Sequence, residues 1–418
     1  MIMQDNEKKP ALRFKGFTDP WEQRKLEEYL EVSGQKNFEG IYTKEDVLSV
    51  SGDFGIVNQI EFQGRSFAGA SVANYGVVET GDIVYTKSPL KSNPYGIIKA
   101  NKGKNGIVST LYAIYKPKQS ANPEFVQIYF EQDARMNNYM HPLVNKGAKN
   151  DMKVSAENAL KGQIVFPDIK EQRTISEFFR NLDTLITLHQ RKYEKLVNIK
   201  KSMLDKMFPK NGASVPEIRF KGFTDPWEQR KLGDAFERVV RKNTNNESRL
   251  PLTISAQDGL VDQITYFNNR VASRDVSNYY LVYNGEFAYN KSTSDGYPFG
   301  AVKRLDWYEK GVLSTLYIVF ALKHPEKDDS DFMTVFYDTD RWHRGVAERA
   351  AEGARNHGLL NISADDFFDI DTTMPEDKVE QEKIGRLLKK LDTLITLHQR
   401  KLEKLQNIKK SCLEKMFV

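Results

Sequence analysis

The sequence predicts an α+β protein built as an internal tandem repeat with pseudo-two-fold symmetry. Residues 182–208 and 391–417 share one 27-residue sequence that differs at only four positions. A second block, RFKGFTDPWEQRKL, occurs unchanged at 13–26 and at 219–232. The long repeats carry a helical pattern, whereas the regions between the repeats carry strand patterns. We therefore expect two mixed α/β domains joined by two long helices that pair as an antiparallel coiled coil.

The order of these motifs predicts four segments. Residues 1–166 form the first mixed domain, and residues 167–212 form the first repeated helix. Residues 213–374 form the second mixed domain, and residues 375–418 form the second repeated helix. A helix of this length would span roughly 55–60 Å at 1.5 Å per residue.

Apolar residues recur along both helices at the spacing of a coiled-coil seam. One stripe per helix is too narrow for a large core, so the two helices are expected to pair with each other. The expected seam contains Leu182, Leu185, Ile186, His189, Leu196, Met203, Leu391, Leu394, Ile395, His398, Leu405 and Leu413. The matching histidines are interpreted as a buried polar pair that fixes the register of the helices. The basic faces opposite the seam are either solvated or attract an acidic partner or a nucleic-acid backbone.

Composition favours a multidomain globular protein of the cytoplasm. The chain has 418 residues, too many for a single core, and 28% of them are charged. The first residues show no apolar secretory segment, and no stretch reaches the roughly 18 apolar residues of a membrane span. Cys412 is the only cysteine, which excludes an internal disulfide and suits a reducing compartment.

The two variable regions share landmarks but differ in detail. Residues 81–88 and 285–292 alternate β-branched or aromatic residues with others after a glycine, which predicts strands. The tetrapeptide STLY occurs at 109–112 and again at 314–317. Between these landmarks the two regions barely match, which suggests two modules of one fold with different ligands.

Catalytic motifs are missing from the sequence. It contains no GxxxxGK[ST] phosphate loop, no GxGxxG after a strand, no HExxH and no GxSxG. We therefore expect no catalytic site and no metal site in this chain.

A lysine-rich segment is the sequence feature that points to nucleic-acid binding. Residues 86–123 contain seven lysines and no acidic side chain, whereas residues 233–374 carry 16 basic and 22 acidic side chains. Lysine binds phosphate and asparagine can read base edges, although a lysine-rich loop can also bind nothing. The candidate DNA-binding residues are Tyr85, Lys87, Ser88, Lys91, Asn93, Lys102, Lys104, Lys149, Asn150, Tyr289, Lys291, Ser292, Lys303, Arg304, Arg355 and Asn356.

Together these features resemble the specificity subunit of type I restriction–modification systems. The tandem PWEQRKL blocks, the helices that begin Glu171-Gln172 and Glu380-Gln381, and the GD-x-V-Y-x-K-S type of strand carry the resemblance. It implies two target-recognition domains that each read one half of a bipartite target in double-stranded DNA, with the paired helices as spacer.

The resemblance also implies partners and a division of labour. Two modification (methyltransferase) subunits and restriction (motor-nuclease) subunits would dock on this chain, which has no catalytic role and binds no cofactor or membrane. S-adenosylmethionine, ATP and Mg²⁺ are expected on the partner subunits. Two other interpretations stay open: a self-contained DNA methyltransferase or endonuclease, and a coiled-coil scaffold whose variable domains bind proteins.

Overall fold

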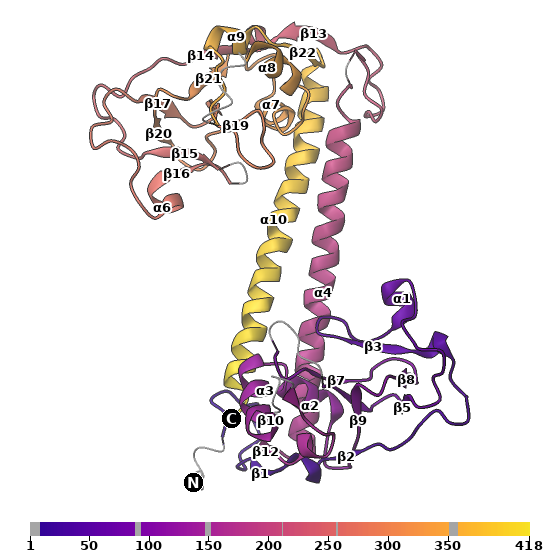
Figure 1. The fold of residues 1–418 in the computed structure, drawn as a ribbon. Helices are drawn as coiled ribbons and strands as arrows, with labels where there is room; N and C mark the ends of the chain where they lie inside the picture. Colours follow the sequence, from indigo (N-terminus) through magenta and orange to yellow (C-terminus); the bar gives the residue numbers. More distant parts are fainter. Residues whose placement is uncertain (1–8, 88–92, 147–151, 211, 256–257, 351–357) are drawn as a thin grey trace. The chain divides into compact units, whose positions relative to one another are not determined.

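The chain divides into two compact units, each a mixed domain combined with part of both long helices (Figure 1). Unit 1 comprises Met1–Gln190 with Arg400–Val418, and unit 2 comprises Arg191–Gln399. The computed structural model describes residues 9–87, 93–146, 152–210, 212–255, 258–350 and 358–418. Antiparallel strands and helices occur in both units, so the predicted α+β fold is confirmed.

The mixed domain of unit 1 is built around a four-stranded antiparallel sheet. Its strand order is β2 (Leu30–Val32), β9 (Tyr112–Pro117), β6 (Ile83–Thr86) and β7 (Ile98–Ala100). Two-stranded pairs are β1 (Glu22–Lys25) with β12 (Gln163–Phe166), β3 (Leu48–Ser51) with β4 (Gly55–Asn58), β5 (Gly76–Val78) with β8 (Gly106–Val108), and β10 (Asn145–Lys146) with β11 (Met152–Lys153). The short helices are α1 (Gln59–Gln63), α2 (Pro123–Tyr129) and α3 (Asp133–Met140).

Unit 2 repeats this topology, except that its described residues contain no counterpart of the β10–β11 pair. Its four-stranded sheet has the order β14 (Phe236–Arg238), β21 (Ile318–Leu322), β18 (Phe287–Asn290) and β19 (Ala301–Arg304). The pairs are β13 (Glu228–Lys231) with β22 (Asp371–Met374), β15 (Leu252–Ser255) with β16 (Gly259–Asp262), and β17 (Tyr280–Tyr283) with β20 (Lys310–Leu313). The short helices are α5 (Leu232–Ala235), α6 (Gln263–Phe267), α7 (Ser330–Phe336), α8 (His343–Arg349) and α9 (Ala364–Phe368).

The central strands are buried on both faces, which explains their continuous apolar sequences. In β6, Ile83 and Tyr85 belong to the main core of unit 1, whereas Val84 packs in a second cluster with Val108 and Ile114. In the equivalent β18, Phe287 and Tyr289 likewise face one cluster and Ala288 the other. A strand with period-two side chains therefore joins two cores in each domain.

The duplicated RFKGFTDPWEQRKL block anchors each mixed domain to a long helix. Arg13 donates two hydrogen bonds of 2.7 Å to Glu171, and Arg219 donates bonds of 2.7 and 2.8 Å to Glu380. Both glutamates are only 1% exposed. A buried carboxylate needs such a bidentate partner, so the block is invariant between the halves for a structural reason.

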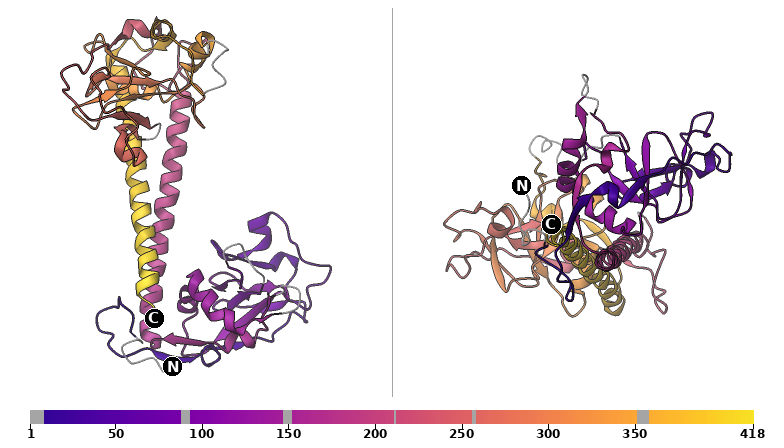
Figure 2. Two further views of the ribbon diagram at one scale, coloured as in Figure 1. Left: turned by 60° about the vertical axis from the view of Figure 1, so that its left-hand side comes forward. Right: turned by 90° about the horizontal axis from the view of Figure 1, so that it is seen from below.

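The tryptophan of the same block packs against the end of a long helix. Trp21 lies edge-on to Phe417, with ring centroids 6.2 Å apart, and Trp227 lies edge-on to Phe208 at 5.8 Å. In unit 1 the C-terminal end of the chain thus completes the core of the first mixed domain (Figure 2). Leu12 N–H also donates to the Lys415 carbonyl at 2.8 Å, which fixes the block to that helix end.

The two long helices each contain 38 residues: α4 (Ile169–Lys206) and α10 (Lys378–Lys415). Within each unit they run side by side and antiparallel (Figures 1 and 2). Gly385 lies inside α10 because the chain of α7 approaches there: an added Cβ would lie 2.6 Å from the backbone nitrogen of Phe332.

The observed burial along the helices differs from the expected seam at one point. Leu182 and His398 are each only 6% exposed, but Leu185 is 46% exposed and lies at the flank. Leu185 departs from the strict 4–3 spacing that starts at Leu182, so it turns away from the facing helix. The other expected seam residues are partly buried. The predicted pairing of His189 with His398 stays a prediction.

Lysines occupy two positions in the seam spacing, whereas the sequence pattern predicts Lys200 and its counterpart Lys409 on the basic face opposite the seam; that placement is wrong. In unit 2, Lys200 lies 2.6 Å from Asp392 on the facing helix and 3.0 Å from Asp338 of the mixed domain. In unit 1, Lys409 lies 2.9 Å from Asp183 and 2.9 Å from Glu131. In each unit this lysine forms ion pairs with the facing helix and with the mixed domain, so it ties the domain to both helices. The antiparallel pairing of the helices brings these charges together.

Candidate nucleic-acid interface

Two aromatic residues of the predicted interface lie in the cores and not at the surface. Tyr85 is 1% exposed and Tyr289 is fully buried. The Tyr85 hydroxyl donates to the Tyr95 carbonyl at 2.7 Å, and the Tyr289 hydroxyl donates to the Phe299 carbonyl at 2.9 Å. Burial raises the pKa of Tyr85 to about 12. The prediction that these rings contact DNA does not fit their burial; instead they tie down the loop after each strand.

Two predicted cations of unit 2 are committed to internal ion pairs. Lys303 lies 2.9 Å from Asp338, and Arg304 lies 2.6 Å from Asp306 and 2.7 Å from Asp331. The Arg304 side chain is only 11% exposed. Carboxylates of the same domain therefore hold both cations, and the part of the patch expected around β19 is engaged in contacts within the protein.

The remaining described candidates lie at the surface or partly buried. Lys87 donates to the Thr110 carbonyl at 3.3 Å, and Lys291 donates to the Ile362 carbonyl at 3.4 Å, so each of these contacts is with a neutral backbone group. Lys102 lies 3.6 Å from Glu124. The others in this group are Lys104, Ser292 and Asn93, the first two exposed and the last partly buried. Ser88, Lys91, Lys149, Asn150, Arg355 and Asn356 lie outside the described residues.

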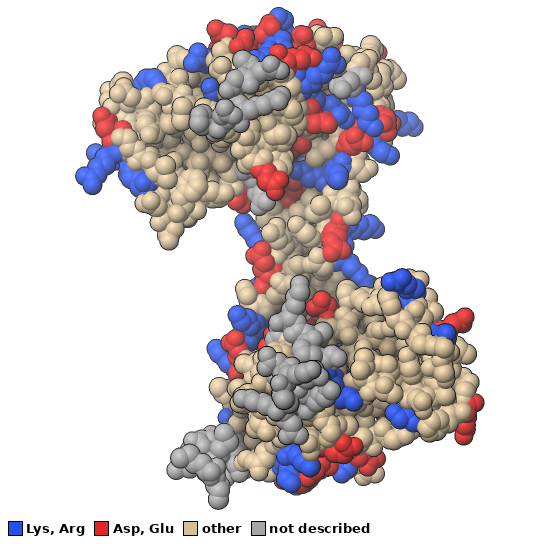
Figure 3. All heavy atoms as spheres, viewed as in Figure 1, with Lys and Arg blue, Asp and Glu red and all other residues tan. Residues whose placement is uncertain are grey.

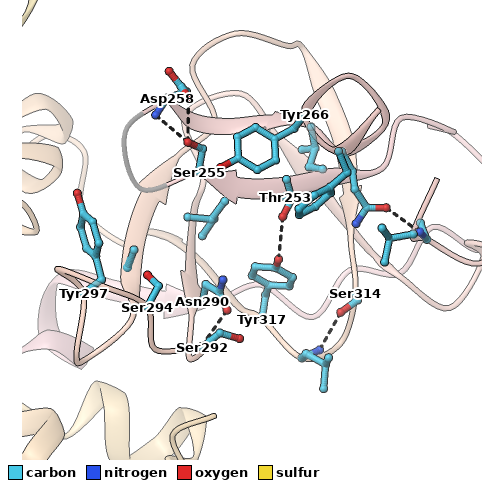
Figure 4. Close-up of a pocket in the computed structure, with 18 of the residues that line it drawn as sticks. Thr253, Ser255, Asp258, Tyr266, Asn290, Ser292, Ser294, Tyr297, Ser314 and Tyr317 are labelled. Atoms are coloured by element: carbon cyan, nitrogen blue, oxygen red, sulfur yellow. Dashed lines mark hydrogen bonds between the residues drawn. The ribbon is translucent and has the colours of Figure 1, made fainter. Parts of the chain in front are cut away.

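A cavity of about 800 Å³ opens in the mixed domain of unit 2 between the β15–β16 hairpin, α6 and the loops after β18 and β20 (Figure 4). The polar side chains around it are mainly hydroxyls, amides and two carboxylates. The lining residues are Leu252, Thr253, Ile254, Ser255, Asp258, Gln263, Tyr266, Phe267, Val271, Ala272, Tyr279, Asn290, Ser292, Thr293, Ser294, Asp295, Tyr297, Ala301, Ser314, Leu316 and Tyr317. Among these described residues there is neither lysine nor arginine.

Hydrogen bonds hold the polar groups of the cavity in place (Figure 4). The Thr253 and Tyr317 hydroxyls lie 3.4 Å apart and share a hydrogen bond. The Ser255 hydroxyl donates to Asp258 at 2.9 Å and accepts from the Asp258 N–H at 3.1 Å. Because these groups are tied to strands and tight turns, the polar pattern is ordered before any ligand arrives.

The rim of the cavity is apolar and exposed. Tyr266 and Phe267 are each 50% exposed, Leu316 is 63% exposed and Val271 is 65% exposed. On the face shown in Figure 3, few charged side chains lie over β15, β16 and α6. A concave surface of fixed polar groups within an apolar rim suits a ligand that offers both hydrogen-bonding edges and apolar groups.

The first domain carries the same scaffold with other side chains. The Gln59 carbonyl oxygen Oε1 accepts from the Phe67 N–H at 2.6 Å after α1, and Gln263 Oε1 accepts from the Ala272 N–H at 2.6 Å after α6. Leu111, in the first STLY turn, is 65% exposed, close to its counterpart Leu316. The repeated STLY motif was the sequence signal for this surface, but nothing in the sequence marked the apolar rim.

The part of the chain that the structure describes contains neither a metal-binding cluster nor a membrane-spanning helix. No group of three or more His, Cys, Asp or Glu side chains there could hold a metal ion. Within the same residues no helix is both long and apolar enough to cross a membrane.

No family model and no curated protein matches the sequence. Among solved structures, the S subunit of the type I restriction–modification system from M. genitalium matches with 12% sequence identity and a TM-score of 0.58, over 98% of this chain and 99% of that chain. This chain shares the S-subunit fold. The HsdS subunit from Thermoanaerobacter tengcongensis matches with 12% identity over 95% of this chain and 96% of that chain, at a TM-score of 0.42. The S-subunit fold extends over both mixed domains and both long helices, because the match includes nearly all of this chain and nearly all of the M. genitalium subunit.

Proposed function

We propose that this chain is the non-catalytic, DNA-reading specificity subunit of a type I restriction–modification complex. The observation that carries the proposal is the S-subunit fold over 98% of the chain, at a TM-score of 0.58. In this proposal each mixed domain reads one half of a bipartite target in double-stranded DNA, and the paired helices space the two halves.

The duplicated scaffold with unlike surfaces supports two readers. Both units use the same strand order and the same Arg–Glu anchors, Arg13 with Glu171 and Arg219 with Glu380. The variable side chains differ, because residues 27–166 carry 15 basic and 15 acidic side chains while residues 233–374 carry 16 basic and 22 acidic side chains, a net charge of −6. Two unlike readers on one scaffold would give an asymmetric, two-part target.

Exposed apolar residues on the long helices support two identical partners. Leu188 is 56% exposed and its counterpart Leu397 is 45% exposed, both within the sequence LDTLITLHQR that occurs in each helix. The same apolar position on two identical segments offers the same docking site twice. We assign these segments to two modification subunits, which would bring S-adenosylmethionine, while restriction subunits would bring ATP and Mg²⁺.

Methyl transfer with purified components tests the proposal. This chain alone, incubated with DNA, labelled S-adenosylmethionine and Mg²⁺, should neither methylate nor cleave the DNA. The chain assembled with its modification subunits should methylate one bipartite sequence. Methylation or cleavage by the chain alone would favour a self-contained enzyme, and an assembled complex that methylates without a bipartite preference would contradict the assignment.

A further inference from the structure

We infer that the cavity of unit 2 reads the base edges of one half-site through hydroxyl, amide and carboxylate groups, and favours A·T pairs, which offer it the adenine amino group and the thymine methyl. The inference rests on the proposed function and extends it to the chemistry of one half-site. It concerns the surface between the β15–β16 hairpin, α6 and the STLY turn after β20.

The charges of the lining decide which base edges fit. Asp258 and Asp295 are the charged residues among the described lining of the cavity. In the major groove guanine presents two acceptors, O6 and N7, and is read best by a bidentate arginine or by lysine. A carboxylate repels those acceptors but accepts a hydrogen bond from cytosine N4 or adenine N6. Because each base pair has one amino group in the major groove, the carboxylates favour an orientation in which adenine or cytosine, and not guanine, faces the cavity.

The neutral polar groups fit the same task. Asn290 is the last residue of strand β18 and Ser292 follows it, and an amide can pair with both N6 and N7 of adenine. The Asn290 side chain already accepts from the Ser292 N–H at 3.0 Å, which fixes the orientation of its oxygen and leaves its amino group to donate. Thr253 and Tyr317 add hydroxyls that can donate or accept.

The exposed apolar rim fits thymine. Tyr266, Phe267, Val271 and Leu316 are each at least half exposed around the polar floor. The thymine C5-methyl is the apolar group in the major groove, and aromatic or aliphatic side chains contact it. The polar groups of the lining and the exposed apolar residues around them together favour a half-site that is rich in A·T pairs.

Two cations next to the cavity lining could contact a phosphate backbone. Arg270 and Arg274 are exposed and flank Val271 and Ala272, two residues of the lining. Phosphate contacts position a protein on DNA, whereas base contacts specify the sequence. This separation, cations outside and acceptors inside, lets the domain bind DNA despite its net negative charge.

The test uses the full chain assembled with its modification subunits on a library of randomised DNA targets, with methylated sequences read out. We expect the double variant Asp258→Asn, Asp295→Asn to relax one half-site by about tenfold or more at one or more base pairs, and to leave the other half-site unchanged. Asparagine keeps the size of aspartate but can donate to guanine or thymine acceptors. Arg274→Ala should lower the rate on all sequences together and leave the motif unchanged.

Controls separate this inference from the proposed function. Glu309→Gln removes an exposed carboxylate of the same domain that does not line the cavity, and it should change neither half-site. An unaltered motif for the double aspartate variant, with a wild-type melting temperature, would overturn the inference while the proposed function stands. Absence of any bipartite motif with the wild-type chain would instead overturn the proposed function.

Discussion

Lys200 should stabilise unit 2 far more than its neighbours on the same helix. Its side chain is 17% exposed, and it joins α4 to Asp338 at 3.0 Å and to Asp392 at 2.6 Å. Burial works to lower the pKa of Lys200, but the two carboxylates outweigh burial and the pKa is raised. The substitution Lys200→Met keeps the length of the stem and the helix propensity but removes the charge.

The loss of stability in Lys200→Met depends on the contacts that its two carboxylate partners keep. Breaking a buried ion pair costs about 3–5 kcal/mol. Asp338 keeps Lys303 at 2.9 Å, and Asp392 is 42% exposed, so solvent screens much of its loss. We therefore expect Lys200→Met to lower the free energy of unfolding by about 2–3 kcal/mol. The matched control Lys201→Met, at an exposed position, should change it by less than about 0.5 kcal/mol.

Urea unfolding followed by tryptophan fluorescence measures this difference, because most of the signal comes from unit 2, which contains Lys200. Three of the four tryptophans, Trp227, Trp307 and Trp342, belong to unit 2. With a slope of about 2–3 kcal/mol per M, the midpoint for Lys200→Met should fall by about 1 M. Equal midpoints for the two methionine variants would refute the assignment of Lys200 as a tie between helices and domain.

The pH dependence has a definite sign. The raised pKa of Lys200 gives stability that is present below the ordinary lysine value, about 10.4, and is lost as pH rises through the folded value. Burial works to raise the pKa of Asp338, but Lys303 and Lys200 outweigh it and the pKa is lowered. That contribution is present above about pH 3.9 and is lost as pH falls through the folded value. Wild type and Lys200→Met should therefore differ most between about pH 5 and 9.

Three further predictions concern the anchors and the spacer. Arg219→Ala leaves Glu380, 1% exposed, without its bidentate partner and should cost about 3 kcal/mol in urea unfolding, whereas exposed Lys221→Ala should cost little. Tyr289→Phe removes the hydrogen bond to the Phe299 carbonyl and should lower the free energy of unfolding by about 1 kcal/mol. An unchanged urea midpoint would contradict this prediction. Seven residues inserted after both Lys192 and Lys401 keep the heptad and should lengthen the unread gap in methylation maps without altering either half-site; a constant gap would mean that the helices are not the spacer.

The sequence predicted the architecture well because the repeat and its helical periodicity are local signals. The 38-residue lengths of α4 and α10 and their pairing within each unit follow from an apolar stripe and from the absence of helix breakers in α4. The role of the RFKGFTDPWEQRKL block did not follow. Its Arg13 reaches Glu171 across 158 positions of sequence, and only the folded chain brings those residues together.

The candidate interface was predicted less well, because residue type does not reveal burial or partners. Tyr85 and Lys303 have the chemistry of DNA-binding residues, but one lies in a core and the other pairs with Asp338. The cavity of unit 2 combines residues from the chain segments 252–279 and 290–317, and its apolar rim looks in the sequence like ordinary core residues. Exposure of Leu316 and Val271 is a property of the fold alone.

An exchange of residues 27–166 for those of a relative with a different target, followed by methylation-site mapping in cells that carry the partner subunits, tests the central claim most directly. If each mixed domain reads its own half of the DNA target, one half-site will change and the other half-site and the gap will stay the same. A map in which both half-sites change, or in which neither does, would contradict the account.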